Sequence, residues 1–385
     1  MTNIKLGDLC KSCAGQIKVE DDELIDYIDI SSIDNEKKKL IGFQTMPFGE
    51  SPSRARKVVK KGSILVSTVR PNLNAIAVLE NDTPNISVAS TGFCILDCKD
   101  DVDNRFVFNF CKSRKFIDDM VSKATGASYP AVTDKIIRAV LVPNYTYEEQ
   151  CNISKVLDSI SDIIDKREAE LFSLDELIKA RFVELFGDPV KNPKGWEVVT
   201  IGDIATEVRY GTSKPAVEGG RYPYLRMNNI TSDGHLDLND LKYIDITEDE
   251  IEKCVVRKGD VLFNRTNSIE LVGKTAVFDL LDDMVIAGYI IRVRLNERIL
   301  PEVFSQYMNL EALKNILRSM AKGAVNQANI NAQELQSIKV YIPDMGAQKK
   351  FIEIKDQVDK SKVVVQKALD ETKLLFDSLM QKYFG

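Results

Sequence analysis

The chain has 385 residues, 44% of them hydrophobic, which predicts two to four compact units with ordinary cores. It contains no apolar run near the ~18 residues of a membrane-spanning helix. Its first residues lack the basic and then apolar pattern of a secretion signal. We therefore expect a cytoplasmic protein that does not enter membranes. Seven cysteines, an odd number in a chain of this size, argue against a disulfide framework.

Two pairs of closely spaced cysteines raise the alternative of a structural zinc site. The pairs are Cys10 with Cys13 and Cys94 with Cys98. Zinc needs four ligands that close a tetrahedron, yet the two pairs stand far apart in the sequence. The second half of the chain has no counterpart to either pair. We expect reduced, partly buried cysteines and no metal.

The sequence repeats its landmarks in the same order at an offset of roughly 197 residues, far longer than a solenoid period. The repeated landmarks are Leu6-Gly7-Asp8-Leu9 with Ile201-Gly202-Asp203-Ile204, Lys61-Gly62-Ser63 with Lys258-Gly259-Asp260, Gly126 with Gly323, and Leu185-Phe186-Gly187 with Tyr383-Phe384-Gly385. We predict the same assembly twice, as an internal repeat: a mixed α/β part followed by a long helix.

The first mixed part is predicted over residues 1–146. Short β-branched runs at 64–69 and 86–96 indicate strands, and helical spacing of apolar residues over 105–123 indicates a helix. Arginine and asparagine pair with guanine and adenine edges, so polar loops that contain them suit base recognition. The alternative for any single residue is a solvated surface loop. The candidate DNA-contacting residues here are Arg54, Arg56, Lys57, Arg70, Asn72, Asn74, Ser128 and Tyr129.

A long helix is predicted over residues 147–188. Its apolar residues recur at alternating steps of four and three from Ile153 to Leu185, which is the heptad rhythm of a coiled coil. Arg167 and Arg181 occupy two positions of this seam. Gly187 followed by Pro189 indicates the end of the helix.

The second mixed part is predicted over residues 189–343, with strands at 276–278 and 285–295 and a helix over 303–322. Its candidate DNA-contacting residues stand in loops rich in arginine and asparagine, to which the same alternative applies. They are Arg209, Tyr210, Thr212, Ser213, Lys214, Arg226, Asn228, Asn229, Arg265, Asn267, Lys322, Asn326 and Gln327.

A second long helix, over residues 344–385, repeats the heptad rhythm. Phe351, Val358, Val365, Leu375 and Leu379 belong to its apolar stripe. One amphipathic helix of this length cannot bury its stripe alone, and two such helices are present. We predict that the two helices pack on each other as a coiled coil; the alternative is that each packs on its own mixed part.

The acidic character of the chain is concentrated in the first long helix. The formal net charge is −6 overall and −6 for residues 147–188, while residues 1–146, 189–343 and 344–385 have +1, −2 and +1. Neutralisation of phosphates by Lys and Arg supplies most non-specific DNA affinity. We therefore expect weak DNA binding by the chain alone and a contribution from a basic partner.

Catalytic motifs are absent from the sequence. A single histidine, His235, excludes most triad and histidine-dependent metal chemistry, and its Ser-Asp-Gly-His turn predicts an exposed side chain. Gly273-Lys274-Thr275 resembles the end of a phosphate loop, but Ser268 stands where the first glycine belongs. The chain lacks a dinucleotide fingerprint, a nucleophile elbow and the Asn-Pro-Pro-aromatic tetrad of amino-methyltransferases. We expect no catalytic residue and no cofactor on this chain.

The repeated plan resembles, over the whole chain, the specificity (S) subunit of type I restriction–modification systems. The boundary Leu185-Phe186-Gly187-Asp188-Pro189 with Lys194-Gly195-Trp196-Glu197 is the most specific similarity. Gly259-Asp260-Val261-Leu262 with Arg265-Thr266-Asn267, and Asn326-Gln327 after Gly323, are also similar. The first half departs from this pattern, since Ser63 replaces the Asp and Ser128-Tyr129-Pro130 replaces the Asn-Gln. Such a departure fits domains that read different sequences.

The resemblance implies an α+β fold in which two similar α/β target recognition domains are separated by two long antiparallel helices, a pseudo-twofold internal repeat. Each domain would read one half of a split double-stranded DNA site, and the helices would set the gap. Two modification subunits, which bind S-adenosylmethionine and methylate adenine, would dock on this non-catalytic chain, and restriction (motor-nuclease) subunits can join. The alternatives are a stand-alone DNA methyltransferase or nuclease with an unrecognised active site, and a coiled-coil scaffold that binds only protein.

Overall fold

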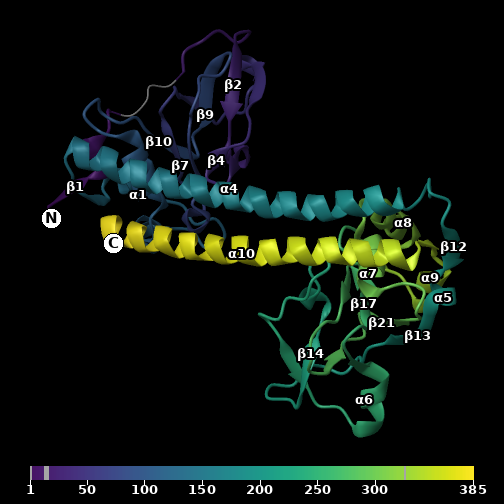
Figure 1. Ribbon diagram of the computed structural model, residues 1–385. Helices are drawn as coiled ribbons and strands as arrows, with labels where there is room; N and C mark the ends of the chain where they lie inside the picture. Colours follow the sequence, from purple (N-terminus) through teal and green to yellow (C-terminus); the bar gives the residue numbers. More distant parts are fainter. Residues whose placement is uncertain (1, 13–16, 325–326) are drawn as a thin grey trace. The chain divides into compact units, whose positions relative to one another are not determined.

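The computed structural model describes residues 2–12, 17–324 and 327–385, with the backbone alone for residues 322–324 and 327. It divides into two compact units (Figure 1). Unit 1 contains residues 1–168 and 367–385, and unit 2 contains residues 169–366. Each unit therefore combines one mixed α/β part with a portion of each of the two long helices.

The strands of unit 1 form two main sheets and two strand pairs. The mixed sheet has the order β5 (Gln44–Pro47), β2 (Leu24–Ile28), β9 (Ile86–Ser90), β6 (Ala55–Val58), in which only β2 and β9 are parallel. The antiparallel sheet has the order β10 (Phe93–Leu96), β7 (Ile64–Ser67), β8 (Ile76–Val78). The pairs are β1 (Asn3–Lys5) with β11 (Leu141–Pro143) and β3 (Ile33–Asp34) with β4 (Lys39–Leu40).

The helices of unit 1 correct one prediction. The unit contains the 3₁₀ turns η1 (Leu6–Leu9), η2 (Ile30–Ser32), η3 (Phe48–Glu50) and η4 (Pro71–Leu73), and the helices α1 (Asn104–Lys112), α2 (Arg114–Lys123) and α3 (Asp134–Arg138). The single helix predicted over 105–123 is wrong, because Ser113 is extended and its hydroxyl accepts a hydrogen bond from the amide of Phe116. A serine N-cap thus starts a second helix. The strand predicted over 86–96 is likewise two strands, β9 and β10.

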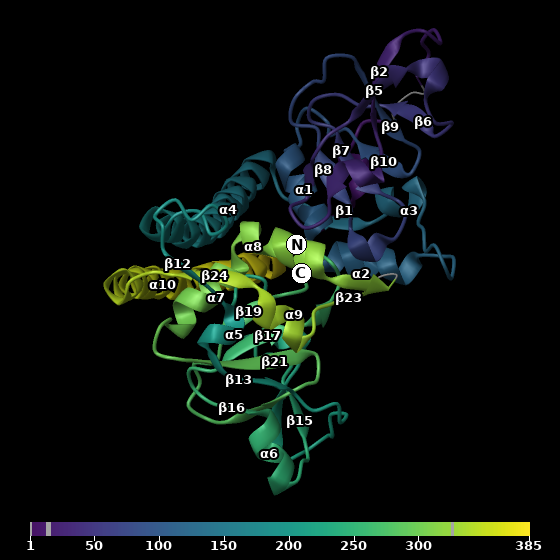
Figure 2. The same ribbon diagram turned by 90° about the vertical axis from the view of Figure 1, so that its right-hand side faces the viewer.

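Unit 2 repeats most of this topology and extends it. Its mixed sheet has the order β15 (Lys242–Ile244), β14 (Tyr222–Leu225), β20 (Met284–Ile286), β16 (Val255–Val256), again with one parallel pair, β14 and β20. Its antiparallel sheet has the order β13 (Ala205–Tyr210), β21 (Ile290–Leu295), β17 (Val261–Asn264), β19 (Thr275–Val277) (Figure 2). β12 (Glu197–Thr200) pairs with β24 (Lys339–Ile342), and a further sheet has the order β18 (Thr266–Asn267), β23 (Gln327–Asn329), β22 (Lys322–Ala324). The predicted repeat is confirmed at the level of topology.

The helices of unit 2 also match those of unit 1. They are α5 (Ile201–Ile204), η5 (Met227–Asn229), α6 (Glu248–Cys254), α7 (Pro301–Asn309), α8 (Glu311–Met320) and α9 (Ala332–Ser337). The helix predicted over 303–322 is again two helices, since Leu310 is extended between α7 and α8. The predicted strand over 285–295 is β20 followed by β21.

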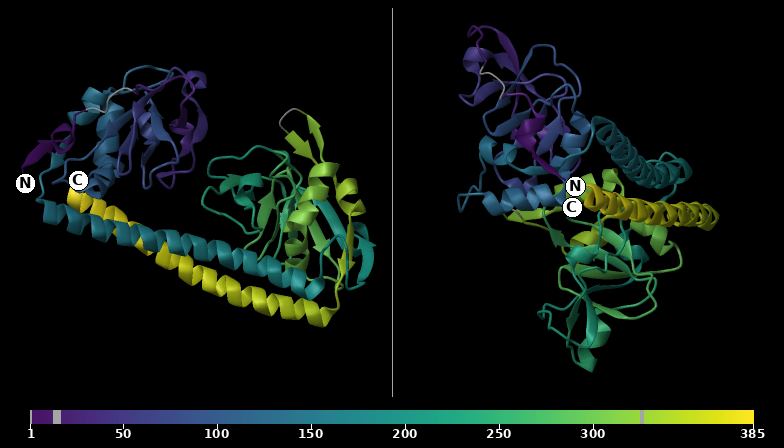
Figure 3. Two further views of the ribbon diagram at one scale, coloured as in Figure 1. Left: turned by 90° about the horizontal axis from the view of Figure 1, so that it is seen from above. Right: turned by 90° about the vertical axis from the view of Figure 1, so that its left-hand side faces the viewer.

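The two long helices are α4 (Tyr147–Phe186) and α10 (Met345–Phe384). In unit 1, Ile153 and Leu157 of α4 share a core with Met380 and Phe384 of α10. In unit 2, the ring of Phe351 on α10 lies 5.3 Å from that of Phe182 and 5.6 Å from that of Phe186. The helices therefore run antiparallel in both units (Figure 3).

Each end of the helix pair also packs on a mixed part. The Phe384 ring lies 5.4 Å from that of Phe106 in unit 1, and the Phe182 ring lies 6.0 Å from that of Tyr307 in unit 2. The predicted pairing of the helices is confirmed, and the alternative, packing on the mixed parts, is present beside it. Heptad positions can satisfy both because an amphipathic stripe wider than a coiled-coil seam contacts two neighbours.

Two positions of the predicted seam between the long helices need separate description, the polar Arg167 and the apolar Leu375. Arg167 does face α10, where its guanidinium donates to the carbonyl of Ala368 and to the hydroxyl of Thr372. Leu375 does not belong to the seam, since it is 51% exposed. The buried Thr372, three residues before Leu375, and the half-buried Phe376, one residue after it, take its place.

Candidate nucleic-acid interface

In unit 1, the segment that follows β7 lies against the polar loop that Gly126 opens. Thr125 and Ala131 close this loop through two backbone hydrogen bonds of 3.0 and 2.9 Å. Gly126 has φ +101°, and a Cβ there would stand 2.8 Å from the carbonyl oxygen of Tyr129, so the loop requires glycine. Val69, two residues after β7, forms an antiparallel bridge with Ala131. The amide of Arg70 donates to the carbonyl of Pro130 at 2.7 Å.

This contact brings two predicted site residues together at the surface. The Arg70 guanidinium lies over the Tyr129 ring, with its carbon 5.2 Å from the ring centroid. The Tyr129 side chain is 68% exposed, and Arg70 is exposed as well. Arg70 adopts a left-handed backbone conformation with φ 49°. A non-glycine residue rarely adopts this conformation, and such residues are frequent in ligand-contacting segments.

Unit 2 has the same arrangement with different residues. After β17, β18 (Thr266–Asn267) pairs with β23 (Gln327–Asn329), which in turn pairs with β22 (Lys322–Ala324). The Thr266 hydroxyl donates to Asn329 Oδ1 at 2.8 Å. The segment that follows the central strand therefore meets the loop opened by Gly126 or Gly323 in both units.

Arg265 is the arginine of unit 2 that stacks on a tyrosine. Its guanidinium carbon lies 4.9 Å from the ring centroid of Tyr210, and its Nη1 donates to the carbonyl of Gly288 at 3.1 Å. The Tyr210 hydroxyl accepts a hydrogen bond from the amide of Ala332 at 2.8 Å. Arg265 and Tyr210 are therefore each held by a hydrogen bond to a backbone group as well as by the stack.

Several predicted site residues of unit 1 bond within the protein. Lys57 forms an ion pair with Asp134 at 2.8 Å and donates to the carbonyl of Phe93. Asn74 is buried and donates to the carbonyl of Cys111 at 3.1 Å. The Arg56 guanidinium lies over the Phe48 ring at 5.5 Å. The predicted residues that stay exposed are Arg54, Arg70, Asn72, Ser128 and Tyr129.

In unit 2, the predicted basic residues mostly pair with acids. The pairs are Arg209 with Glu207 at 3.0 Å, Arg226 with Asp240 at 2.7 Å and Lys214 with Glu250 at 2.6 Å. The Lys214 ammonium, with Thr247, lowers the pKa of Glu250 to about 2.

The predicted amides of unit 2 divide between internal and exposed positions. Asn229 is buried and donates to the carbonyl of Asp237 at 2.8 Å, and Asn267 donates to Asn264 at 2.8 Å. Asn228 and Ser213 are exposed, and Thr212 is half-buried. Asn326 lies outside the described residues, and the side chains of Lys322 and Gln327 are not described.

The change from Asp260 to Ser63 between the repeats preserves the structure of a turn. Asp260 accepts from the amide of Arg257 at 2.9 Å and from Arg294 Nε at 2.9 Å. In unit 1 the Ser63 hydroxyl accepts from the amide of Lys60 at 3.1 Å and donates to Asp97 at 2.6 Å. This position supports the central strand in both units, and sequence reasoning did not assign that role.

The cysteines do not form a metal site in the described part of the chain. Within residues 2–12, 17–324 and 327–385 there is no group of three or more His, Cys, Asp or Glu side chains that could hold a metal ion. Cys10 and Cys98 face each other on an antiparallel bridge, and Cys13 lies outside the described residues. Burial raises the pKa of the Cys94 thiol to about 12, which favours the protonated, unreactive form.

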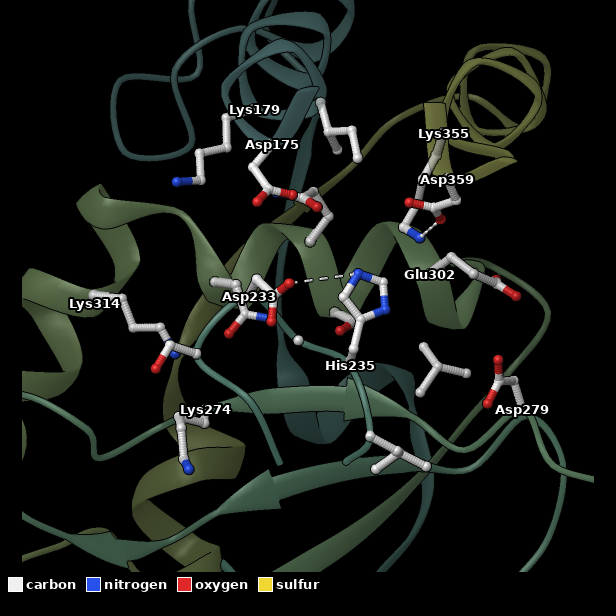
Figure 4. Close-up of a pocket in the computed structure, with 18 of the residues that line it drawn as sticks. Asp175, Lys179, Asp233, His235, Lys274, Asp279, Glu302, Lys314, Lys355 and Asp359 are labelled. Atoms are coloured by element: carbon white, nitrogen blue, oxygen red, sulfur yellow. Dashed lines mark hydrogen bonds and ion pairs between the residues drawn. The ribbon is translucent and has the colours of Figure 1, made fainter. Parts of the chain in front are cut away.

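A cavity in unit 2 is lined by charges of both signs. It has a volume of about 760 Å³ and is bordered by α4, α10 and the turn that contains His235 (Figure 4). The His235 side chain is 43% exposed and stands 3.8 Å from Asp233. Lys362 bonds to Asp175 at 2.5 Å. Because acidic side chains outnumber lysines and arginines in its lining, this cavity lacks the excess positive charge that DNA requires.

Two lysines that line this cavity point their ammonium groups at backbone carbonyls. Lys274 donates to Met227 and Ile230, and Lys314 donates to Gly273. Burial lowers the pKa of Lys314 to about 7. Gly273-Lys274-Thr275 therefore forms a turn into β19 and holds no free lysine for a phosphate.

None of the helices in the described residues is both long enough and apolar enough to span a bilayer.

Comparison with known proteins finds similarity to DNA specificity proteins. Residues 193–372 match the family model described as type I restriction modification DNA specificity domain. The specificity subunit of the type I restriction enzyme EcoKI from Escherichia coli (strain K12) is 25% identical over 299 residues, which cover 72% of this chain. They cover 64% of that subunit, so the match spans less than two thirds of this relative.

Solved structures share the fold. A chain from a study of the assembly and conformational transition of a type I R-M system aligns with a TM-score of 0.62 at 22% identity, covering 100% of this chain and 97% of that chain. The S subunit of a type I restriction–modification system from M. genitalium aligns with a TM-score of 0.58 at 15% identity, covering 100% and 96%. The predicted α+β class is confirmed.

Proposed function

We propose that this chain is a specificity subunit of a type I restriction–modification system, a class to which it is similar. In this role it reads a bipartite site on double-stranded DNA with one unit per half-site. The two mixed parts act as target recognition domains, and the paired helices set the gap between them. The chain supplies recognition and contributes no catalytic residue.

The observation that carries this proposal is the duplicated topology, in which the region after the central strand is built from different segments in the two units. Both units bring the segment after the central strand against a polar loop. Unit 1 stacks Arg70 on Tyr129 of that loop, whereas unit 2 stacks Arg265 on Tyr210 of β13. A shared scaffold whose surface is built from different segments is the arrangement expected of two readers of unlike sequences.

The linkage of two readers explains why each can bind weakly. When one unit is bound, the other meets its half-site at a high effective concentration, provided that the gap fits. Affinity and specificity then multiply only at the correct spacing. The antiparallel helix pair is suited to fix that spacing, because its contacts continue in both units from Phe351 and Phe186 to Phe384 and Ile153.

The helix pair also supports the docking of modification subunits, two of them in our proposal. In unit 2 the apolar side chains of Phe172, Val363 and Val364 are 67%, 69% and 68% exposed, and in unit 1 Leu374 is 72% exposed. Large apolar side chains on long helices that stay in water mark surfaces for protein partners. S-adenosylmethionine would be bound by these partners, which would flip the target adenine out of the duplex. Restriction subunits would join the same assembly.

The test is to map methylated adenines in a host that lacks its own methylation and expresses the chain with its modification subunit. We expect one motif made of two short half-sites at a constant gap. The control is the same host without the chain, which should show no motif. A continuous motif, or none at all with both proteins present, would contradict the proposal.

A second arm addresses the alternatives. Purified chain incubated with S-adenosylmethionine and DNA should transfer no methyl groups, whereas transfer would favour a stand-alone methyltransferase. The complex should retain DNA that contains the mapped motif over DNA without it. Equal retention of both DNAs would favour a scaffold that binds only protein.

A further inference from the structure

We infer that Arg70 is a base-reading residue of unit 1 that recognises a guanine, whereas Arg265 of unit 2 positions its loop. This inference rests on the proposed function and deepens it, since it assigns unequal roles to two arginines that stack on tyrosines in the corresponding regions of the two units.

The backbone at Arg70 is held firmly on both sides. Its amide donates to Pro130, and its carbonyl accepts from the amide of Leu73 at 2.9 Å. Pro71, the next residue, is buried and begins η4. Lys38 donates to the carbonyl of Leu73 at 3.1 Å from the neighbouring β3–β4 turn. The left-handed conformation at Arg70 is therefore imposed by its surroundings and places an exposed side chain at a fixed point.

The guanidinium of Arg70 has one face covered and its edge uncommitted. Tyr129 covers the face. Among the residues that the structure describes, no hydrogen bond or ion pair engages the guanidinium nitrogens of Arg70. A guanidinium stacked on a ring keeps its in-plane N–H groups for other acceptors. Two parallel N–H groups match the O6 and N7 acceptors of guanine in the major groove.

The guanidinium of Arg265 is already committed. Nη1 donates to Gly288, and Nε is buried without a partner in the described structure. Its tyrosine is bonded to Ala332. A bidentate contact with guanine would require Arg265 to leave Gly288. The geometry therefore makes Arg265 a positioning residue, which joins β17, the Tyr210 strand and the Gly288 turn.

The test uses the complex of the full chain with its modification subunits and duplexes that carry each of the four base pairs at every position of both half-sites. Arg70→Ala and Arg70→Lys are compared with wild type by competitive binding. We expect both variants to lose the preference for guanine at one position by about 5- to 150-fold, the range of one bidentate contact. Preferences at all other positions should stay unchanged. Lysine retains the charge but not the paired donors.

The matched control is Arg265→Lys, which should weaken binding to all duplexes alike and leave every base preference in place. Because Arg70 is exposed, thermal unfolding of the Arg70 variants should equal that of wild type. Retention of all preferences by Arg70→Lys would overturn the inference and assign Arg70 to a phosphate. Loss of one base preference in Arg265→Lys would also overturn it. Absence of any sequence preference in the wild-type complex would instead reject the proposed function itself.

Discussion

Buried lysines are a residue-scale feature that both units share. Burial lowers the pKa of Lys314 in unit 2 to about 7 and that of Lys112 in unit 1 to about 8. Lys112 lies over the rings of Phe108 and Phe376 at 4.8 and 5.5 Å, and Lys314 bonds to the carbonyl of Gly273. Within the described part of the chain, neither ammonium forms an ion pair with a carboxylate, so the cost of burying the charge falls on the folded state.

Lys314 gives the chain a predictable dependence of stability on pH. The folded pKa of about 7 lies below the ordinary value of 10.5, so between these values the unfolded state binds more protons. The contribution of Lys314 to the free energy of unfolding must therefore rise as the pH rises from 7 towards 10. We expect the melting temperature of wild type minus that of Lys314→Met to increase from pH 7 to pH 9.5.

The control for this measurement is Lys258→Met, which changes an exposed lysine of the same unit. Its difference from wild type should stay constant over the same pH range. A constant difference for Lys314→Met as well would show that Lys314 keeps its charge in the folded state.

At the same scale, sequence reasoning identified the polar loops but could not identify which of their residues face solvent. Arg70 and Tyr129 were predicted and lie together at the surface. Asn74 and Asn229 were predicted with equal weight, yet both are buried and bond to backbone carbonyls. An asparagine that stabilises a loop and one that reads a base have the same local sequence, because both occur where the backbone leaves regular structure.

At the scale of elements, periodicity predicted the long helices well and the short ones poorly. The heptad rhythm located α4 and α10 and their pairing. It could not show the breaks at Ser113 and Leu310, because the apolar spacing continues across them while single extended residues turn the chain. The prediction that Leu375 lies in the seam is wrong for a related reason. Where the long helices meet the mixed parts, the residues of α10 that are buried no longer follow the heptad spacing.

The helix pair predicts how the gap between half-sites would respond to a deletion. Removal of residues 162–168 together with residues 369–375 takes one heptad from each helix and removes Arg167 along with its partner Thr372. Seven residues correspond to ~10 Å of helix, or about three base pairs of DNA. We expect the motif of methylated cells to keep both half-sites and to lose about three base pairs from its gap.

A deletion of residues 162–168 alone is the control, since it shifts one helix against the other and should abolish methylation by mispairing. The prediction is contradicted if the double deletion changes the half-sites while the gap stays constant.

At the scale of the whole molecule, charge indicates that the chain works with partners. The formal net charge is −6, and residues 147–188 alone have −6. Several basic residues of the predicted surface pair with acids, such as Arg226 with Asp240. Few cations are therefore left to neutralise phosphates.

We expect the chain alone to bind DNA weakly, with a shallow dependence of the binding constant on salt. Since the slope of log K against log salt reports the number of phosphates neutralised, the complex with modification subunits should show a steeper slope. Fluorescence anisotropy over a series of NaCl concentrations measures both. Equal affinity and equal slopes for chain and complex would refute a basic contribution from the partner.

Unit 1 is made of two segments that are separated in the sequence, and this has a consequence for its synthesis on the ribosome. Its core contains Phe106 and Phe110 beside Phe384, and Tyr145 donates its hydroxyl hydrogen bond to the carbonyl of Tyr383. Unit 2 is encoded entirely between the two portions of unit 1. At 5–20 residues per second, roughly 10 to 40 s pass between the emergence of Glu168 and that of Phe384. The core of unit 1 therefore keeps an open apolar face until Phe384 has been made, and unit 2, made later, is the first that can complete its core.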